Sequence, residues 1–139
     1  MSVPEPFQFY EVKPQLLESG KQGRYVAKTD LMMVEVQVSA KDGGETNLHS
    51  HPALDGSWLV LAGKARFYTE GDKEVATLGP YQGLVVPRGT MYWFECASDD
   101  NLVIIRHAAR DPNESVQRVD GSPRVENEVK VKEGAYFGR

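Results

Sequence analysis

The sequence has little of what would tie it to a membrane or to a secreted, disulfide-stabilised scaffold. Its 139 residues include a single cysteine, Cys96, so an intramolecular disulfide is excluded. No apolar run approaches the roughly 20 residues that a membrane-spanning helix requires. The N-terminal stretch has neither the charged segment nor the apolar segment of a signal peptide. These absences predict a cytoplasmic protein without a membrane partner.

An excess of positive charge is also missing. Lys and Arg number 16 against 20 Asp and Glu, which gives a formal net charge of −4, and the basic residues are scattered along the chain. Proteins that bind nucleic acid concentrate basic residues in a patch or stripe, so nucleic acid is not an expected partner. The apolar fraction of 40% and the length of the chain suit one soluble globular domain.

Long amphipathic helices are absent as well, and short alternating segments take their place. Beyond residue 25, turn residues recur roughly every ten residues, which is typical of an all-β domain. We expect strands over residues 31–39, 46–51, 57–61, 64–69, 74–78, 83–86, 90–96 and 101–107. About eight antiparallel strands with glycine turns favour a double-sheet jelly roll.

The two ends of the chain are expected to flank this barrel, whose core we place at residues 30–108. Residues 1–29 are interpreted as an N-terminal arm with a proline-marked edge strand near residue 8 and one helical turn after Pro14. Residues 109–139 are interpreted as a surface loop followed by an edge strand over 125–132. The apolar end of the chain should dock on its own barrel or on a neighbouring subunit. Two edge strands without neighbours favour a homodimer.

His49 and His51 are the residues that point most directly to chemistry. On a strand, side chains alternate between faces, so both imidazoles project the same way, as two ligands of a transition metal would. A helix would put them on different faces. The Gly43-Gly44 turn before them and Pro52 after them favour the strand. The alternative is that both are ordinary strand residues, one hydrogen-bonded and one facing solvent.

The segment 43–63 resembles the first motif of the cupin superfamily, G-x5-H-x-H-x(3,4)-E-x6-G. The glycines at its two ends stand in register with the motif, as do His49 and His51. The glutamate position falls on Gly56, with Asp55 immediately before it. The segment therefore keeps the histidine pair of the motif and lacks its carboxylate.

A second segment, 81–96, is similar to the second cupin motif, G-x5-P-x-G-x2-H-x3-N. Its Pro-Arg-Gly at 87–89 fits P-x-G, whereas Tyr92 stands at the histidine position and Cys96 at the asparagine position. The resemblance covers roughly residues 30–108 and implies a double-stranded β-helix, the jelly-roll barrel of cupins. It does not choose an activity, because cupins host many unrelated functions.

The resemblance implies a divalent transition metal, Fe, Mn, Ni or Zn, held by His49 and His51. Tyr92 is a candidate third ligand, although a phenol has a free pKa near 10 and is a poorer ligand than imidazole; the alternative is that it caps the pocket by packing. His107 is expected at the same mouth of the barrel, as a ligand, a general base or a rim residue. Asp55 offers a carboxylate near the motif's glutamate position, or forms an Asx turn.

The walls of the site follow from the same alternation of faces. Trp58 and Phe94 are expected to line an aromatic cavity beside Gly56 that suits a small organic ligand, or else to be ordinary core residues. Arg88, in the loop at the mouth, is a candidate partner for a carboxylate of that ligand, or a solvated loop residue. Cys96 is expected to be a small core residue.

Two functions of different classes remain open. The first is a metal-dependent oxygenase, isomerase or decarboxylase that acts on a small carbonyl- or carboxylate-bearing ligand, with Tyr92 or His107 completing the site. The second is a cupin that binds a small molecule without turnover and retains a vestigial metal site. The spacing of the histidine pair favours the first function, and the incomplete ligand set favours the second.

Overall fold

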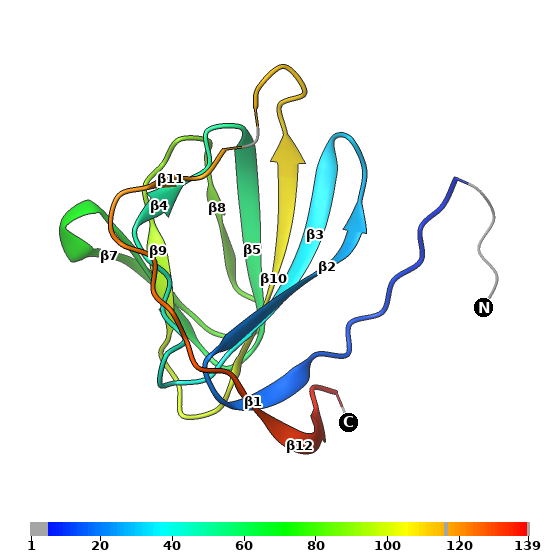
Figure 1. Cartoon of the computed structure of the whole chain (residues 1–139), viewed down its shortest axis with the longest axis vertical. Helices are drawn as coiled ribbons and strands as arrows, with labels where there is room; N and C mark the ends of the chain where they lie inside the picture. Colours follow the sequence, from blue (N-terminus) through cyan, green and yellow to red (C-terminus); the bar gives the residue numbers. More distant parts are fainter. Residues whose placement is uncertain (1–5, 116, 139) are drawn as a thin grey trace.

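The larger of two facing β-sheets has five antiparallel strands in the order β2-β3-β10-β5-β8 (Figure 1). The computed structural model describes residues 6–115 and 117–138. The members of this sheet are β2 (Lys21–Lys28), β3 (Met32–Ser39), β10 (Leu102–Arg110), β5 (Leu54–Ala62) and β8 (Gly83–Val86). β10 lies between β3 and β5, which are distant from it in sequence, as a jelly roll requires.

The second sheet is built on β6 (Ala65–Thr69), which pairs with β7 (Lys73–Leu78) and β9 (Trp93–Cys96). A short 3-10 turn, η1 (Glu70–Asp72), joins β6 to β7. The pair β4 (His49–Ser50) and β11 (Val119–Asp120) continues this sheet beyond β9. The link is a bridge in which His49 and Tyr92 exchange backbone hydrogen bonds of 3.0 and 2.9 Å. The predicted all-β double-stranded β-helix is confirmed.

The strand that carries the histidines is shorter than residues 46–51. Regular pairing covers only β4, although the backbone N–H of Thr46 also bonds to the carbonyl of Phe94 at 2.9 Å. Pro52 lies two residues beyond β4, and its lack of an N–H prevents the ladder from continuing.

No helix in residues 6–115 and 117–138 is long and apolar enough to cross a membrane.

The inner core lies between the sheets because each strand turns alternate residues inward. The Phe67 and Phe94 rings stack with centroids 5.0 Å apart, and Trp58 lies 5.0 Å from Phe94. Val60, Leu102 and Ile104 complete this cluster together with Cys96, so the predicted inward positions of Trp58, Phe94 and Cys96 are confirmed. The remaining volume between the sheets is the cavity that holds the candidate site.

The outer face of the larger sheet carries a second apolar cluster, which includes Val34, Val36, Val38, Val103 and Ile105. It is covered by β1 (Gln15–Ser19) and β12 (Lys130–Tyr136), which pair with each other. Leu17 of β1 is fully buried in this cluster. The expected helical turn after Pro14 is therefore wrong, because burial of Leu17 against the sheet outweighs the local helical preference.

A buried amide clamps this covering strand to the barrel. The Asn101 side chain accepts a hydrogen bond from the backbone N–H of Leu17 at 2.6 Å and donates one to its carbonyl at 2.9 Å. Both backbone groups are buried, so without Asn101 they would lose their partners. The two contacts join segments 84 residues apart in the sequence.

The C-terminal tail docks on its own chain, as one of the two expectations had it. Phe137 packs against the outer cluster, and its N–H donates to the carbonyl of Pro14 at 2.9 Å. The edge strand is β12 rather than residues 125–132. The segment 117–129 (orange in Figure 1) runs from β11 at one end of the barrel to β12 at the other.

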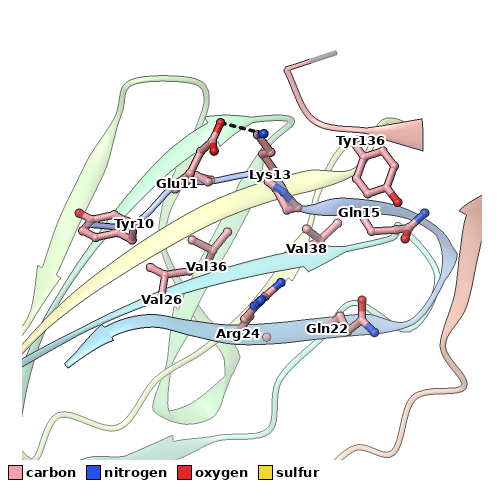
Figure 2. Close-up of a pocket in the computed structure, with 13 residues that line it drawn as sticks. Tyr10, Glu11, Lys13, Gln15, Gln22, Arg24, Val26, Val36, Val38 and Tyr136 are labelled. Carbon is pink, nitrogen blue, oxygen red and sulfur yellow. Dashed lines mark ion pairs between the residues drawn. The ribbon is translucent and has the colours of Figure 1, made fainter. Parts of the chain in front are cut away.

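The N-terminal arm forms no strand over residues 7–14. Instead the Gln8 side chain holds the backbone of Lys28, with bonds of 2.8 and 3.2 Å to its carbonyl and N–H. A groove of about 750 Å³ lies between the arm and the outer face of β2 and β3. Figure 2 shows Val36 and Val38 on the sheet side of this groove, with the Glu11–Lys13 ion pair on the arm. The groove lies across the sheet from the candidate site.

Candidate functional site

A cavity of about 440 Å³ lies between the two sheets and brings together most of the residues predicted from the cupin motifs. His49, His51, Tyr92, Trp58 and Phe94 all line it. Strands β2 and β3 form one wall, β5 and β10 continue it, and the segments of β4, β9 and β11 face them. Residues of the two motifs thus converge on one chamber, as their spacing predicted.

The two histidines face each other edge to face, with ring centroids 5.0 Å apart and planes at 84°. His49 is only 3% exposed, and its Nδ1 lies 2.5 Å from the carbonyl of Asn47. Because a carbonyl can only accept, Nδ1 carries the proton and Nε2 keeps the free lone pair. The alternation of a strand gives both rings the same face, as expected.

Both imidazoles are neutral at pH 7. The pKa of His49 is lowered to about 4, because burial and, to a smaller extent, the positive charge of Arg118 outweigh the opposing hydrogen bond to Asn47. Burial also lowers the pKa of His51 to about 3, with further contributions from Arg106 and then His49. The cause in each case is that an imidazolium ion would lose its water and lie among other cations.

Tyr92 lies beside the histidines, with its ring centroid 4.5 Å from that of His49 and 6.3 Å from that of His51. Burial raises the pKa of its phenol, so the hydroxyl stays protonated at neutral pH. A protonated phenol is a hydrogen-bonding group rather than an anionic metal ligand. The two roles expected of Tyr92, third metal ligand and cap of the pocket, both remain predictions.

Arg106 is the residue that the motif comparison missed. It projects inward from β10, is 5% exposed, and forms an ion pair with Glu35 of β3 at 3.0 Å. Its Nη1 lies 3.5 Å from His51 Nε2, its Nη2 donates to the Tyr25 hydroxyl at 3.3 Å, and its guanidinium carbon lies 5.4 Å from the Trp58 ring centroid. The sequence does contain a signal for Arg106, namely one arginine inside the apolar strand LVIIRHAA. A buried charge without a partner is costly, so such an arginine is expected to have a specific partner or role.

Gly56 faces the cavity at the position where the motif has its glutamate. A Cβ placed there would meet Arg106 Cδ at 3.6 Å and Trp58 Nε1 at 3.9 Å. A recess of about 10 Å³, close to the size of one oxygen atom or water molecule, is lined by Gly56, Arg106, His51 and Tyr92 among others. The space left by the missing carboxylate is therefore bordered by the methylene groups of Arg106 next to its guanidinium and by the indole of Trp58.

Asp55 and Arg88 lie outside the cavity and bond to each other. The Asp55 carboxylate accepts the backbone N–H of Arg88 at 2.8 Å, and the Arg88 guanidinium pairs with Asp111 at 2.8 Å. Both side chains are about half exposed. These contacts fix the loop at 87–89, so the structure does not bring either residue to a ligand in the cavity.

His107 is also placed elsewhere, which corrects the expectation that it reaches the mouth of the pocket. It is exposed and shares the outer face of β10 with Val103 and Ile105, whereas Arg106 takes the inward position. Because consecutive side chains of a strand point to opposite faces, turning Arg106 inward necessarily turns His107 outward. The sequence left that choice open because both faces of β10 are apolar.

Further basic residues surround the chamber. Arg118 and Arg124 line the cavity and share Asp120, at 2.9 and 3.3 Å. Hydrogen bonds from Asn47 and then from these arginines lower the pKa of Asp120 to about 2. Arg118 also donates to the side chain of Asn47, which ties the segment around β11 to β4. Lys21 lines the same cavity, and burial and then Arg118 lower its pKa.

The donor set does not complete a metal site. Within residues 6–115 and 117–138, no group of three or more His, Cys, Asp or Glu side chains is arranged to hold a metal ion. The carboxylate position is Gly56, and the guanidinium of Arg106 stands 3.5 Å from the lone pair of His51. A divalent cation between the histidines would lie next to this fixed positive charge, which opposes binding.

Comparisons with known proteins place the chain by its fold. No protein-family model matches the sequence, and no curated protein matches it either. An uncharacterised Klebsiella pneumoniae protein with a double-stranded β-helix domain superposes with a TM-score of 0.71 at 15% identity, covering 86% of this chain and 96% of its own. KdgF from Halomonas sp. gives 0.57 at 27% identity, with 66% and 81% covered.

A third similar structure is the DMSP lyase DddQ from Ruegeria pomeroyi, with a TM-score of 0.59, 21% identity, and coverage of 73% of this chain and 52% of the lyase. At such identities the likeness shows the fold. The chain therefore has the double-stranded β-helix fold of the cupins, and the two motif-like segments of the sequence converge inside it. A binding or enzymatic role in this chamber fits that class.

Proposed function

We propose that this cupin binds a small organic acid in the cavity between its sheets, without a metal ion at the centre and without turnover. The observation that carries the proposal is the charge of the lining. It has one carboxylate, Glu35, and five basic side chains, those of Lys21, Lys28, Arg106, Arg118 and Arg124. Even with Asp120 added behind the arginines, five positive charges face two negative ones.

An anion in the cavity would relieve an electrostatic cost that the folded chain bears. The pKa of Lys21 is lowered by burial and by Arg118, which means that its charged form is disfavoured where it stands. Attraction between a bound carboxylate and a buried cation such as Arg106 is stronger than the same attraction in bulk water. The whole chain has a net charge of −4, so the positive lining is a local feature.

The size and the walls of the chamber indicate the rest of the ligand. A volume of about 440 Å³ lies within the range of small-molecule sites, whose lining is mostly apolar with a few placed polar groups. The faces of Trp58, Phe94 and Tyr92 offer aromatic surface beside the basic groups. An acid with a ring or a short carbon chain suits this combination.

The test is calorimetric titration of the purified protein with four acids, namely benzoate, phenylpyruvate, succinate and 2-oxoglutarate. Benzamide and methyl benzoate serve as neutral analogues of benzoate. We expect at least one acid to bind with a Kd below about 1 mM, more weakly at high salt, and the neutral analogues not to bind. Absence of binding by all four acids at low salt would refute the proposal.

A metal-dependent oxygenase, isomerase or decarboxylase is the second candidate, and one observation favours it. His49 and His51 are both neutral, and the bond from His49 to Asn47 leaves its Nε2 free, which is the form that a metal binds. Elemental analysis of untagged protein never exposed to chelator would decide. Stoichiometric Fe, Mn, Ni or Zn in the wild type, absent from the His49→Ala/His51→Ala variant, would replace the first proposal with this one.

A further inference from the structure

We infer that the carboxylate of the ligand binds at Arg106 and Trp58 beside Gly56, so that a fixed guanidinium occupies the role that the cupin resemblance assigns to a metal ion. This inference rests on the proposed function and adds to it the atoms that recognise the acid. It makes Arg106 and Trp58 the residues that determine specificity for an anion over its neutral analogue.

Two buried donors without acceptors carry the inference. Among residues 6–115 and 117–138, the Arg106 Nε–H and the Trp58 Nε1–H have no hydrogen-bond partner of normal geometry, although the two residues are only 5% and 2% exposed. The indole lies near enough to the Tyr92 hydroxyl to influence it, but makes no hydrogen bond of normal geometry to it. Buried polar groups are paired in most native proteins, so two adjacent unpaired donors indicate a missing acceptor.

The two donors border the same space. Arg106 Cδ, to which Nε is bonded, lies 3.6 Å from the position of a Cβ on Gly56, and Trp58 Nε1 lies 3.9 Å from it. Gly56 and Arg106 also line the recess of about 10 Å³, whose size suits one carboxylate oxygen, and Trp58 lines the larger cavity beside it. The glycine is what leaves this space open, because any side chain there would project between the guanidinium and the indole.

The charge of the site selects a carboxylate over a neutral acceptor. A guanidinium binds carboxylates through parallel N–H donors, and such charge-assisted bonds are the stronger class. The neutral imidazole of His51 and the protonated phenol of Tyr92 add no negative charge next to Arg106. A cation, by contrast, would meet Arg106 at short range.

Glu35 is the internal competitor for the same guanidinium. Its Oε1 lies 3.0 Å from Arg106 Nη2, yet it receives no hydrogen bond of normal geometry. The ion pair therefore neutralises Arg106 without giving Glu35 Oε1 or Arg106 Nε a hydrogen bond, and the Nε edge stays free for a second carboxylate. The two members of this pair should consequently affect ligand binding in opposite directions.

Affinity measurements on variants of the two partners test this point. Arg106→Lys keeps the charge but loses the Nε–H. For the same four acids, we expect the Kd of this variant to be at least about tenfold higher than that of the wild type. Glu35→Gln keeps the volume and removes the competing charge, and we expect the Kd to fall about threefold or more. Arg66→Gln and Glu74→Gln, which separate an exposed ion pair of 3.1 Å on the other sheet, are the matched controls and should leave the Kd unchanged.

Two further variants and one spectrum keep the test independent of the stability of the ion pair. Trp58→Phe removes the indole donor together with part of its buried ring system but keeps an aromatic side chain, and Gly56→Ala fills the recess at ordinary contact distances. Both variants should fold and bind the acid several-fold more weakly. In a ¹H–¹⁵N spectrum the Trp58 indole signal should move on addition of the acid and not with benzamide. The second indole, Trp93, donates to Asp72 at 3.1 Å outside the cavity and is the internal reference.

The outcomes separate this inference from the proposed function. Opposite shifts in Kd for Arg106→Lys and Glu35→Gln, with movement of the Trp58 signal, would support it. Binding of an acid with an unmoved Trp58 signal, or with equal weakening by both variants, would overturn it and leave the proposed function standing. Failure of every acid to bind would refute both.

Discussion

Lowering the pH from 7 to 5 should destabilise the folded chain through His49 and His51. In the unfolded chain each imidazole has a pKa of about 6.5 and takes up a proton in this range. In the folded chain the pKa values are about 4 and about 3, so both rings stay neutral at pH 5. The unfolded state then binds more protons, and the free energy of unfolding falls as the pH falls.

The size of the effect follows from the unfolded pKa alone, as long as the folded values lie below 5. Each histidine then contributes a loss of about 2 kcal/mol between pH 7 and pH 5, and the pair about 4 kcal/mol. Below this range the loss from each histidine continues to grow until the pH reaches its folded pKa. Most single domains are stable by about 5 to 15 kcal/mol, so the change is readily measured.

Urea unfolding at both pH values, in the presence of a chelator, measures the effect. His49→Asn keeps a donor where Nδ1 stands and His51→Gln keeps an acceptor where Nε2 stands, so the double variant removes the titration with little loss of contacts. Its stability should depend on pH less than that of the wild type by about 4 kcal/mol. His107→Gln is the matched control and should behave like the wild type, because that ring is exposed. An equal pH dependence in the wild type and the double variant would refute the reasoning.

Three further predictions concern the fold, the mouth loop and the assembly. Asn101→Ala leaves the buried N–H and carbonyl of Leu17 unpaired, and we expect about 3 kcal/mol less stability in urea unfolding. Arg88→Gln should cost less than about 1 kcal/mol in the same assay and leave acid binding unchanged by calorimetry, because its ion pairs are half exposed. We propose that the chain is a homodimer, since Phe7 and Phe9 of the N-terminal arm are 73% and 57% exposed. Sedimentation should give twice the chain mass for the wild type and the mass of one chain for the double variant Phe7→Ser/Phe9→Ser. A wild type that is monomeric at all concentrations would contradict the homodimer.

The buried ion pair places two opposite charges inside the barrel. Removal of one partner from a buried pair generally costs several kcal/mol, whereas a well-packed apolar replacement of both is often neutral. Arg106 and Glu35 are therefore not explained by stability alone. A ligand that uses the free edge of the guanidinium supplies the physical reason for keeping this charge beside Trp58, Tyr92 and the two neutral histidines.

Local patterns in the sequence identified the chamber but not every residue that lines it. The spacing of His49 and His51 was sufficient to place both rings on one face, because alternation is a property of any strand. The same rule placed Trp58 and Phe94 inside. Tyr92 was found through its position in the second motif, and the bridge with His49 confirms that the two motifs meet.

The sequence by itself determined the fold class, the turns and the convergence of the two motifs, since these depend on alternation and on glycine and proline. Only the tertiary structure decided which face of β10 turns inward, and with it the exchange of His107 for Arg106. Both faces of that strand are apolar, and the inner one is set by packing against β3 and β5. The tertiary structure also decided that the segment after Pro14 is a strand. The burial of Leu17 and its hydrogen bonds to Asn101 are contacts with residues far away in the chain, so the local sequence does not reveal them.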